Sequence, residues 1–300
     1  MVGKIESSPV PRASPLVGLS LLPTEDFRDF AWNLVDRAMV DVIEWSFDII
    51  WGDGEMTPSW CESILDDFSA RGRLLGHGVT FSPFSGGFTE RQRWWLDKLR
   101  AECDRRRYVQ ISEHFGFMEA GPFVESAPMP VPMTEGAVIL GRRCLEALAR
   151  SSGCPVGLEN LALAFCLEDV RGQGKFLEEV LSRVDGFLVL DLHNLYCQSV
   201  NFDIPMSELL GSYPLGRVRE LHISGGSLSA RRSGAGPAIR RDTHDGPVPE
   251  RVFEILPEAL DRCPGVEYVI LERLGGTIDE LGGAEELIRD YERILEAVDG

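Results

Sequence analysis

The chain has 300 residues, of which 44% are hydrophobic and 26% are charged, a composition typical of a folded globular protein with a sizeable core. Its 48 Asp and Glu outnumber its 30 Lys and Arg, and the resulting formal charge of -18 disfavours nucleic acid and anionic membrane surfaces as partners. The sequence has no apolar run long enough to span a membrane, and residues 1–15 lack the apolar core of a secretory signal, so we expect a cytoplasmic protein.

Residues 1–15 contain three Pro and three Ser without periodicity and predict a flexible lead-in. Beyond them, short apolar runs rich in β-branched residues alternate with longer amphipathic stretches. Strands are expected at residues 16–22, 40–50, 73–81, 107–117, 154–162, 186–196, 218–226 and 267–276. Helices are expected at residues 24–39, 90–105, 134–152, 174–184, 248–263 and 283–298.

Eight strands alternating with helices predict an α/β protein in which residues 16–300 form a single (β/α)8 barrel of the TIM type. A doubly wound open sheet is the alternative, but its Gly-rich nucleotide-binding turn is missing after the first run, where the sequence reads LLPTEDF. Two connections are long: the Pro-rich segment 118–133 and the segment 227–241, which contains Arg231, Arg232, Arg240 and Arg241. Long loops at strand C-termini are where such a barrel holds its functional residues.

Ionisable side chains recur at the ends of six consecutive predicted strands, the third to the eighth. Four of the five histidines lie within or at the end of a strand, the fifth follows the seventh strand after a loop, and acids end the fifth, sixth and eighth strands; together they are His77, His114, His193, His222, His244, Glu159, Asp191 and Glu272. A barrel brings these ends to one place, where unpaired buried charges would cost several kcal/mol each unless a cation held them. Imidazole and carboxylate ligands without thiolates favour iron, manganese or zinc, and so many ligands favour two or three bridged ions.

Asp242 and His244 lie two residues apart, just before the apparent start of a helix. In extended backbone their side chains point the same way and would bind one ion or two neighbouring ions. A surface turn in which Asp242 caps the backbone is the alternative.

Seven motifs in order carry a family resemblance: GHGVTFSP, ISEHFGF, GLENLA, DLHNLY, ELHISGG, DTHDGPVPERVFEIL and ILERLGG. Over roughly residues 16–290 the chain resembles the multinuclear non-haem iron-dependent oxidative enzymes, the family of the methanobactin biosynthesis oxidase. The resemblance implies a barrel with two or three irons, as mixed Fe(II) and Fe(III), and O2 as co-substrate. It also implies oxidation of a side chain, most often Cys, in a ribosomally made precursor peptide, which a separate recognition protein delivers.

The resemblance also implies roles for individual residues. The metal ligands would be His77, His114, Glu159, Asp191, Asn194, His222, Asp242, His244 and Glu272. Asp48, Glu113 and His193 would be catalytic, and Asp48, Glu113 and Glu44 are alternatively hydrogen-bond partners of the ligands or proton handlers. The chain departs from the family at Gly226, where a second His is common, and at Ile49, where an Asn is common. Both departures bear on the substrate more than on the metal.

Two other interpretations stay open. A zinc or manganese sugar isomerase or phosphoesterase of the xylose-isomerase and endonuclease-IV-like group also places His, Glu and Asp at strand ends. A barrel that binds peptide without catalysis is the third. The four Arg of segment 227–241 fit either an acidic peptide or a solvated loop, and the end of the chain soon after the last helix leads us to expect the recognition protein on another polypeptide.

Overall fold

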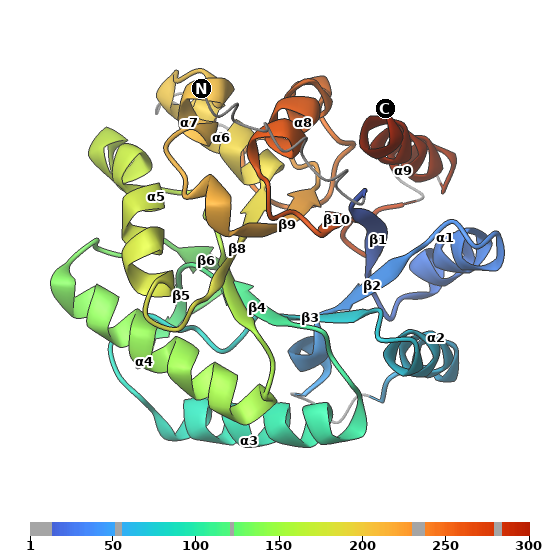
Figure 1. Cartoon of the computed structure of the whole chain (residues 1–300), viewed down its shortest axis with the longest axis horizontal. Coiled ribbons are helices and arrows are strands. Elements are labelled where there is room, and N and C mark those ends of the chain that lie inside the picture. Colours follow the sequence, from blue (N-terminus) through green and yellow to red (C-terminus); the bar gives the residue numbers. More distant parts are fainter. Residues whose placement is uncertain (1–13, 52–55, 121–122, 230–237, 279–283) are drawn as a thin grey trace, which may run out of the picture.

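The computed structural model describes residues 14–51, 56–120, 123–229, 238–278 and 284–300. Its centre is a closed barrel of eight parallel strands in the order β1-β10-β9-β8-β7-β4-β3-β2, with helices packed around the outside (Figure 1). The predicted (β/α)8 barrel is confirmed, and its first strand begins at Leu16 as expected. Residues 1–13 of the expected lead-in lie outside the described residues.

Every barrel strand lies inside one of the eight predicted runs and is shorter than that run. The strands are β1 (Leu16–Leu21), β2 (Val42–Trp45), β3 (Leu74–Gly78), β4 (Ile111–His114), β7 (Val156–Glu159), β8 (Phe187–Asp191), β9 (Val218–Ile223) and β10 (Tyr268–Leu271). Their parallel register sets His114 beside Glu159 and Asp191 beside His222. The strand pairing itself therefore brings together side chains that are far apart in the sequence.

The helices are α1 (Glu25–Asp36), α2 (Ser59–Ala70), α3 (Glu90–Arg105), α4 (Glu135–Ser152), α5 (Leu167–Leu181), α6 (Leu192–Phe202), α7 (Met206–Leu210), α8 (Glu250–Arg262) and α9 (Ala284–Asp299), with short 3-10 turns η1 (Phe47–Ile50) and η2 (Leu215–Arg217). The start of α3 follows from a capping box, in which Thr89 and Gln92 each bond the other's backbone N–H. The expected helix at 174–184 begins earlier, at Leu167, directly after Cys166, and ends at Leu181. In the described residues no helix combines the length and the hydropathy that a membrane span needs.

Segment 118–133 differs from the expected irregular connection. It contributes to an antiparallel hairpin of β5 (Phe117–Ala120) and β6 (Phe123–Met129), outside the barrel. A two-stranded sheet has free edges, so it tolerates Pro128, which would remove a hydrogen bond from a central strand. The prolines that predicted a loop are therefore compatible with edge strands.

Two apolar layers enclose the polar end of the barrel. A large buried cluster lies between the strands and the surrounding helices. A small cluster of Val42, Leu75, Tyr268 and Ile270 lies one layer below the polar residues, because strand residues two positions apart share a face. Water is thereby excluded from the N-terminal end of the barrel, and the polar residues are confined to the other end.

Candidate metal centre

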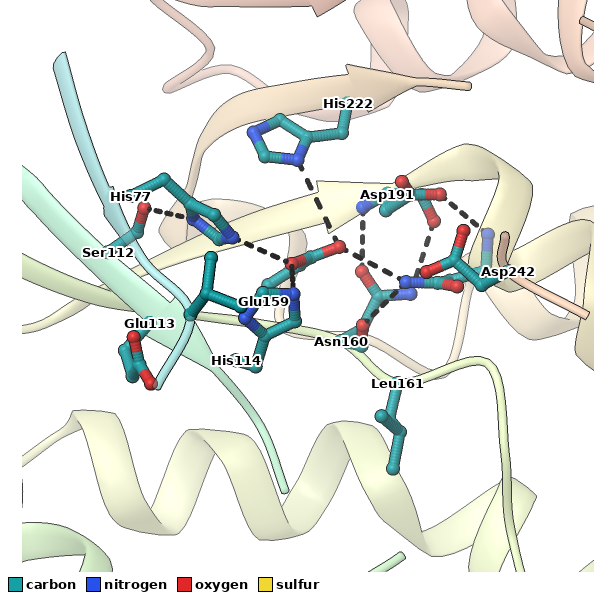
Figure 2. Close-up of polar contacts among 12 residues, drawn as sticks. His77, Ser112, Glu113, His114, Glu159, Asn160, Leu161, Asp191, His222 and Asp242 are labelled. Carbon is teal, nitrogen blue, oxygen red and sulfur yellow. Dashed lines mark hydrogen bonds and ion pairs between the residues drawn. The ribbon is translucent and has the colours of Figure 1, made fainter. Parts of the chain in front are cut away.

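The predicted ligands lie together inside the C-terminal end of the barrel. Figure 2 shows the side chains of His77, His114, Glu159, Asp191 and His222 turned toward one shared space. Their ligand atoms, with those of three further residues, form groups whose members lie within 4.8 Å of one another: His77–His114–Glu159, Glu159–Asp191–His222–Glu272 and Asp191–Asp242–His244. These three groups contain eight of the nine predicted metal ligands.

Glu159, the last residue of β7, lies at the centre of the arrangement. Its Oε2 is 3.4 Å from Nε2 of His77 and 3.4 Å from Nε2 of His114, while its Oε1 is 3.9 Å from Nδ1 of His222. Glu159 is only 2% exposed, so these contacts are shielded from water. A carboxylate placed in this way is able to bridge two neighbouring cations.

Asp191 ends β8 and also caps α6, where its Oδ1 accepts a hydrogen bond of 2.6 Å from the Asn194 backbone N–H. The side chain of Asn160 holds it in place by bonding both the N–H and the C=O of Asp191, at 2.7 and 3.1 Å. Burial raises the pKa of Asp191 well above its usual range, and the negative charges of Asp242 and Glu159 add to the effect. A bound cation would offset the repulsion between these buried carboxylates.

The sequence placed His193 and Asn194 on a strand, and this prediction is wrong, because β8 ends at Asp191 and both residues lie in the first turn of α6. Asn194 still points into the site. Its amide N donates to Glu159 Oε1 at 3.1 Å and to the backbone oxygen of Asn160 at 3.0 Å, and its own Oδ1 has no hydrogen-bond partner. That free oxygen is available to a metal.

Asp242 and His244 meet as predicted, but not through extended backbone, because His244 has a φ of 51°. The two side chains instead turn toward each other, with Nε2 of His244 2.8 Å from Oδ1 of Asp242. Burial raises the pKa of Asp242, but the charge of His244 and the hydrogen bond with His193 outweigh it and hold that pKa well below its usual range. The carboxylate is therefore ionised and available as a ligand.

His193 lies at the edge of the centre and belongs to none of the three groups. Its side chain is completely buried, with Nδ1 3.3 Å from Asp242 Oδ1 and the Cys197 sulfur 3.9 Å from its Nε2. A Cβ at Gly226 would come within 2.8 Å of its Cε1, so the ring occupies the space beside that glycine. The backbone oxygen of Arg241, 2.3 Å from that Cβ position, lies even closer, so this packing favours glycine at position 226.

Asp48 and Glu113, predicted as catalytic, lie outside the three groups as well. Asp48 accepts hydrogen bonds from the backbone N–H groups of residues 79 and 80 and from Trp95 Nε1, at 2.6 to 3.1 Å, and so fixes the turn after β3. Glu113 precedes His114 on β4 and therefore faces the opposite side of the strand, which Figure 2 shows apart from the cluster. Burial raises its pKa well above the usual range, and Asp48 adds to the rise.

Sequence reasoning missed Glu220 and Gln110. Glu220 and Glu44 are completely buried one layer below the predicted ligands, and both carboxylates approach His222. Burial raises the pKa of Glu220 to about 7, with a contribution from the charge of Glu44. The signal was present in the sequence, because Glu220 precedes His222 by two residues on a strand and must face the same side.

One feature of the site, which does not depend on any family resemblance, indicates that these residues could bind several metal ions: some of their buried polar atoms have no hydrogen-bond partner. Nδ1 of His222 and Oε2 of Glu272 lie 3.1 Å apart, both buried, yet neither has a hydrogen-bond partner of ordinary geometry. Burial lowers the pKa of His77, but Glu44 and Glu159 raise it to about 10, so the acids attract positive charge to the site. Buried donors and acceptors without partners, around an excess of carboxylates, are what residues suited to bind metal ions present.

Two of the four Arg of segment 227–241, Arg231 and Arg232, lie outside the described residues. Arg240 is bound within the fold, with a hydrogen bond of 2.6 Å to the oxygen of Gly226 and its guanidinium 5.2 Å from the Tyr196 ring centre. Arg241 bonds Ser227 Oγ at 3.0 Å and is exposed. The predicted contact of this segment with an acidic peptide stays a prediction.

Comparison with solved structures shows the fold. A D-allulose 3-epimerase from Methylomonas sp. is similar over 95% of this chain and 98% of its own, with a TM-score of 0.56 and 14% sequence identity. Endonuclease IV from Thermus thermophilus covers 94% of this chain and all of its own, with a TM-score of 0.54 and 14% identity. At such low identity these likenesses concern the barrel alone.

Sequence comparison identifies the family. A UPF0276 protein of Caulobacter vibrioides is 28% identical over 256 residues, which are 84% of this chain and 85% of the relative. A UPF0276 protein of Rhizorhabdus wittichii is 25% identical over 265 residues, 82% of this chain and 92% of the relative. The family model described as "RiPP precursor modification enzyme MbnB/TglH/ChrH", where RiPP denotes a ribosomally synthesised and post-translationally modified peptide, matches residues 32–297. Apart from β1, the strands and polar residues described above all lie within the matched residues. The chain therefore belongs to this family of RiPP precursor modification enzymes.

Proposed function

We propose that the chain is an O2-dependent oxidase with two or three non-haem irons, which modifies a side chain, most readily a Cys, of a ribosomally made precursor peptide. Membership of a precursor-modifying family supports the substrate class. The observation that carries the proposal is the set of three adjacent donor groups, which share Glu159 and Asp191 as carboxylates between neighbouring positions. A site for a single ion needs no such sharing.

Iron is proposed from the chemistry of the donors. Imidazoles and carboxylates make up all three groups, and no thiolate belongs to them. Such mixed nitrogen and oxygen donors suit iron, and bound irons would supply the O2 and electron-transfer chemistry that protein side chains lack. His77, His114, Glu159, Asp191, Asn194, His222, Asp242, His244 and Glu272 would hold them.

The protein itself contributes geometry and the exclusion of water. Asn160 fixes Asp191 through two backbone hydrogen bonds, and the apolar layers around and beneath the site keep bulk water from the barrel interior. His193 is proposed to act at the edge of the centre, beside Asp242, and Glu113 to hold a proton behind β4. Asp48 is proposed to act on the same side of β4 as Glu113, by holding the turn after β3 in place.

The precursor peptide is proposed to arrive on a separate recognition protein. A metal-dependent sugar isomerase or phosphoesterase is the alternative that the residues left open, and the solved structures support it only through the shared barrel, at 14% identity. The family match names peptide precursors instead.

The test is anaerobic purification followed by metal analysis, with separate samples loaded with iron and with zinc. Each is mixed with O2 and a Cys-containing precursor peptide encoded beside the gene, with and without the partner protein encoded there, and the peptide mass is measured. We expect two or more irons per chain, O2 consumption and a changed peptide mass in the iron sample alone. One zinc or manganese per chain, with no iron taken up, would contradict the proposal and favour the isomerase or hydrolase.

A further inference from the structure

The surroundings of each buried histidine decide which of its two ring nitrogens is free to bind a metal. Nδ1 of His77 is 2.8 Å from Ser112 Oγ, and that hydroxyl donates its own hydrogen to the backbone oxygen of Gly76 at 3.3 Å. With its hydrogen donated to Gly76, the hydroxyl accepts from His77, and this arrangement assigns the His77 proton to Nδ1. Nε2, which faces Glu159 at 3.4 Å, is left with its lone pair for a metal.

His114 has the same arrangement. Its Nδ1 lies 3.2 Å from the backbone oxygen of Gly78, which only accepts hydrogen bonds, so Nδ1 carries the proton. Nε2 again faces Glu159, at 3.4 Å. Both histidines of the first group therefore present Nε2 to the centre.

His222 is oriented the other way round. Its Nδ1 faces the predicted ligands, 3.1 Å from Glu272 Oε2 and 3.9 Å from Glu159 Oε1. Its Nε2 faces the lower layer, 3.2 Å from Glu44 Oε2 in a hydrogen bond and 3.4 Å from Glu220 Oε1. Only the contact at Nε2 has hydrogen-bond geometry, since Nδ1 is without such a partner.

The positions of Glu44 and Glu220 are determined by the fold around His222. Both are completely buried and reach His222 from β2 and β9, strands that are not neighbours in the barrel. Gln110, also completely buried, donates from Nε2 to Glu220 Oε2 at 2.6 Å and so fixes the second carboxylate. No bulk water reaches this layer, so the orientation of the ring depends on these side chains.

We infer that Glu44, supported by Glu220 and Gln110, is a positioning residue that keeps the proton of His222 on Nε2, so that His222 binds metal through Nδ1 while His77 and His114 bind through Nε2. A carboxylate that accepts the second N–H of a metal-bound histidine fixes its tautomer and makes it a stronger ligand. The inference rests on the proposed metal centre, though not on iron or on oxidase activity.

A different use of the same residues is an inner cation between Glu44, Glu220 and His222, whose ligand atoms also lie within 4.8 Å of one another. In that case the ion would replace the proton on Nε2 of His222. If the proton moved to Nδ1, that nitrogen could no longer bind a metal in the Glu159–Asp191–His222–Glu272 group. The hydrogen bond from Nε2 to Glu44 is the observation that favours the positioning role over the inner cation.

The decisive measurement is long-range proton–nitrogen NMR of the zinc-loaded protein labelled with 15N-histidine. Zinc is diamagnetic, and the chain has only five histidines, which single substitutions assign. We expect a protonated Nε2 and a metal-bound Nδ1 for His222, with the opposite pattern for His77 and His114. A metal-bound Nε2 of His222 would overturn the inference in favour of the inner cation, whereas uptake of neither zinc nor iron would refute the metal centre itself.

Two variants test the role of Glu44. Zinc affinity of the His222 group is expected to fall about 10- to 100-fold in Glu44→Ala, with a smaller loss in Glu44→Gln, whose amide oxygen still accepts from Nε2. Glu102→Gln, which removes a partly buried carboxylate that bonds Tyr108 instead, should leave zinc affinity unchanged. Unchanged zinc affinity and an unchanged His222 spectrum in Glu44→Ala would contradict the inference, and Glu220→Gln provides a second variant if Glu44→Ala does not fold.

Discussion

Replacing Glu159 by Gln would remove one negative charge from the centre while keeping the size of the side chain. Two of the three donor groups contain Glu159, and the third, Asp191–Asp242–His244, does not. The substitution should therefore weaken binding at two positions and leave the third intact. The introduced amide would keep an oxygen for the Asn194 side chain, which donates to Glu159 at 3.1 Å, so the local packing should persist.

The expected size of the effect follows from the contacts. His77 and His114 each lose their anionic neighbour at 3.4 Å, and the bridge between two positions is lost. Losing a hydrogen-bond partner of a metal ligand already costs 10- to 100-fold in affinity, so losing a bridging ligand should cost at least about 100-fold, or about 2.7 kcal/mol, at each of the two positions. The variant should then retain about one ion per chain.

Metal content after dialysis against a weak chelator, measured by plasma mass spectrometry, is the assay. Glu146→Gln is the matched control, because it removes the same charge from the exposed face of α4. The control should bind as much metal as the unaltered protein, and circular dichroism should show both variants folded. Full metal content in Glu159→Gln would refute the assignment of Glu159 as a shared ligand.

Three further predictions concern stability and reactivity. Asp48→Ala should lower the free energy of unfolding in urea by about 3 kcal/mol, because the half-buried backbone N–H groups of residues 79–80 and the buried Trp95 Nε1 lose their acceptor. An unchanged value would mean that water replaces the carboxylate. Removing the metal with a strong chelator should lower the thermal unfolding midpoint, since an ion at 100 times its Kd stabilises the fold by about 2.7 kcal/mol, and a midpoint that does not move would contradict a resident metal. At pH 7 a thiol reagent should label exposed Cys166 first and Cys61 only after unfolding, because burial raises the pKa of Cys61 to about 12; early labelling of Cys61, read by peptide mapping, would contradict its burial.

The sequence by itself determined the barrel and most of the side chains that meet at the candidate metal centre. Alternating apolar runs and amphipathic stretches predict parallel strands with helices between them, and parallel strands in a closed barrel bring their C-terminal ends together. Ionisable residues at those ends, such as His77, Glu159 and Glu272, therefore had to meet whatever the details of the loops. Local sequence patterns were enough to predict that these side chains meet, because the barrel topology brings the strand ends together.

Only the tertiary structure decided where the strands stop and which way each polar side chain faces. The run 186–196 is apolar throughout most of its length, so nothing local showed that Asp191 would end the strand and cap a helix that contains His193 and Asn194. Glu113 and His114 are adjacent on β4, and the register with the neighbouring strands determines that the histidine faces the centre. The contact of Glu44 with His222 depends likewise on packing across the barrel, because strand spacing and register, which no local pattern specifies, determine which buried groups come within reach of each other.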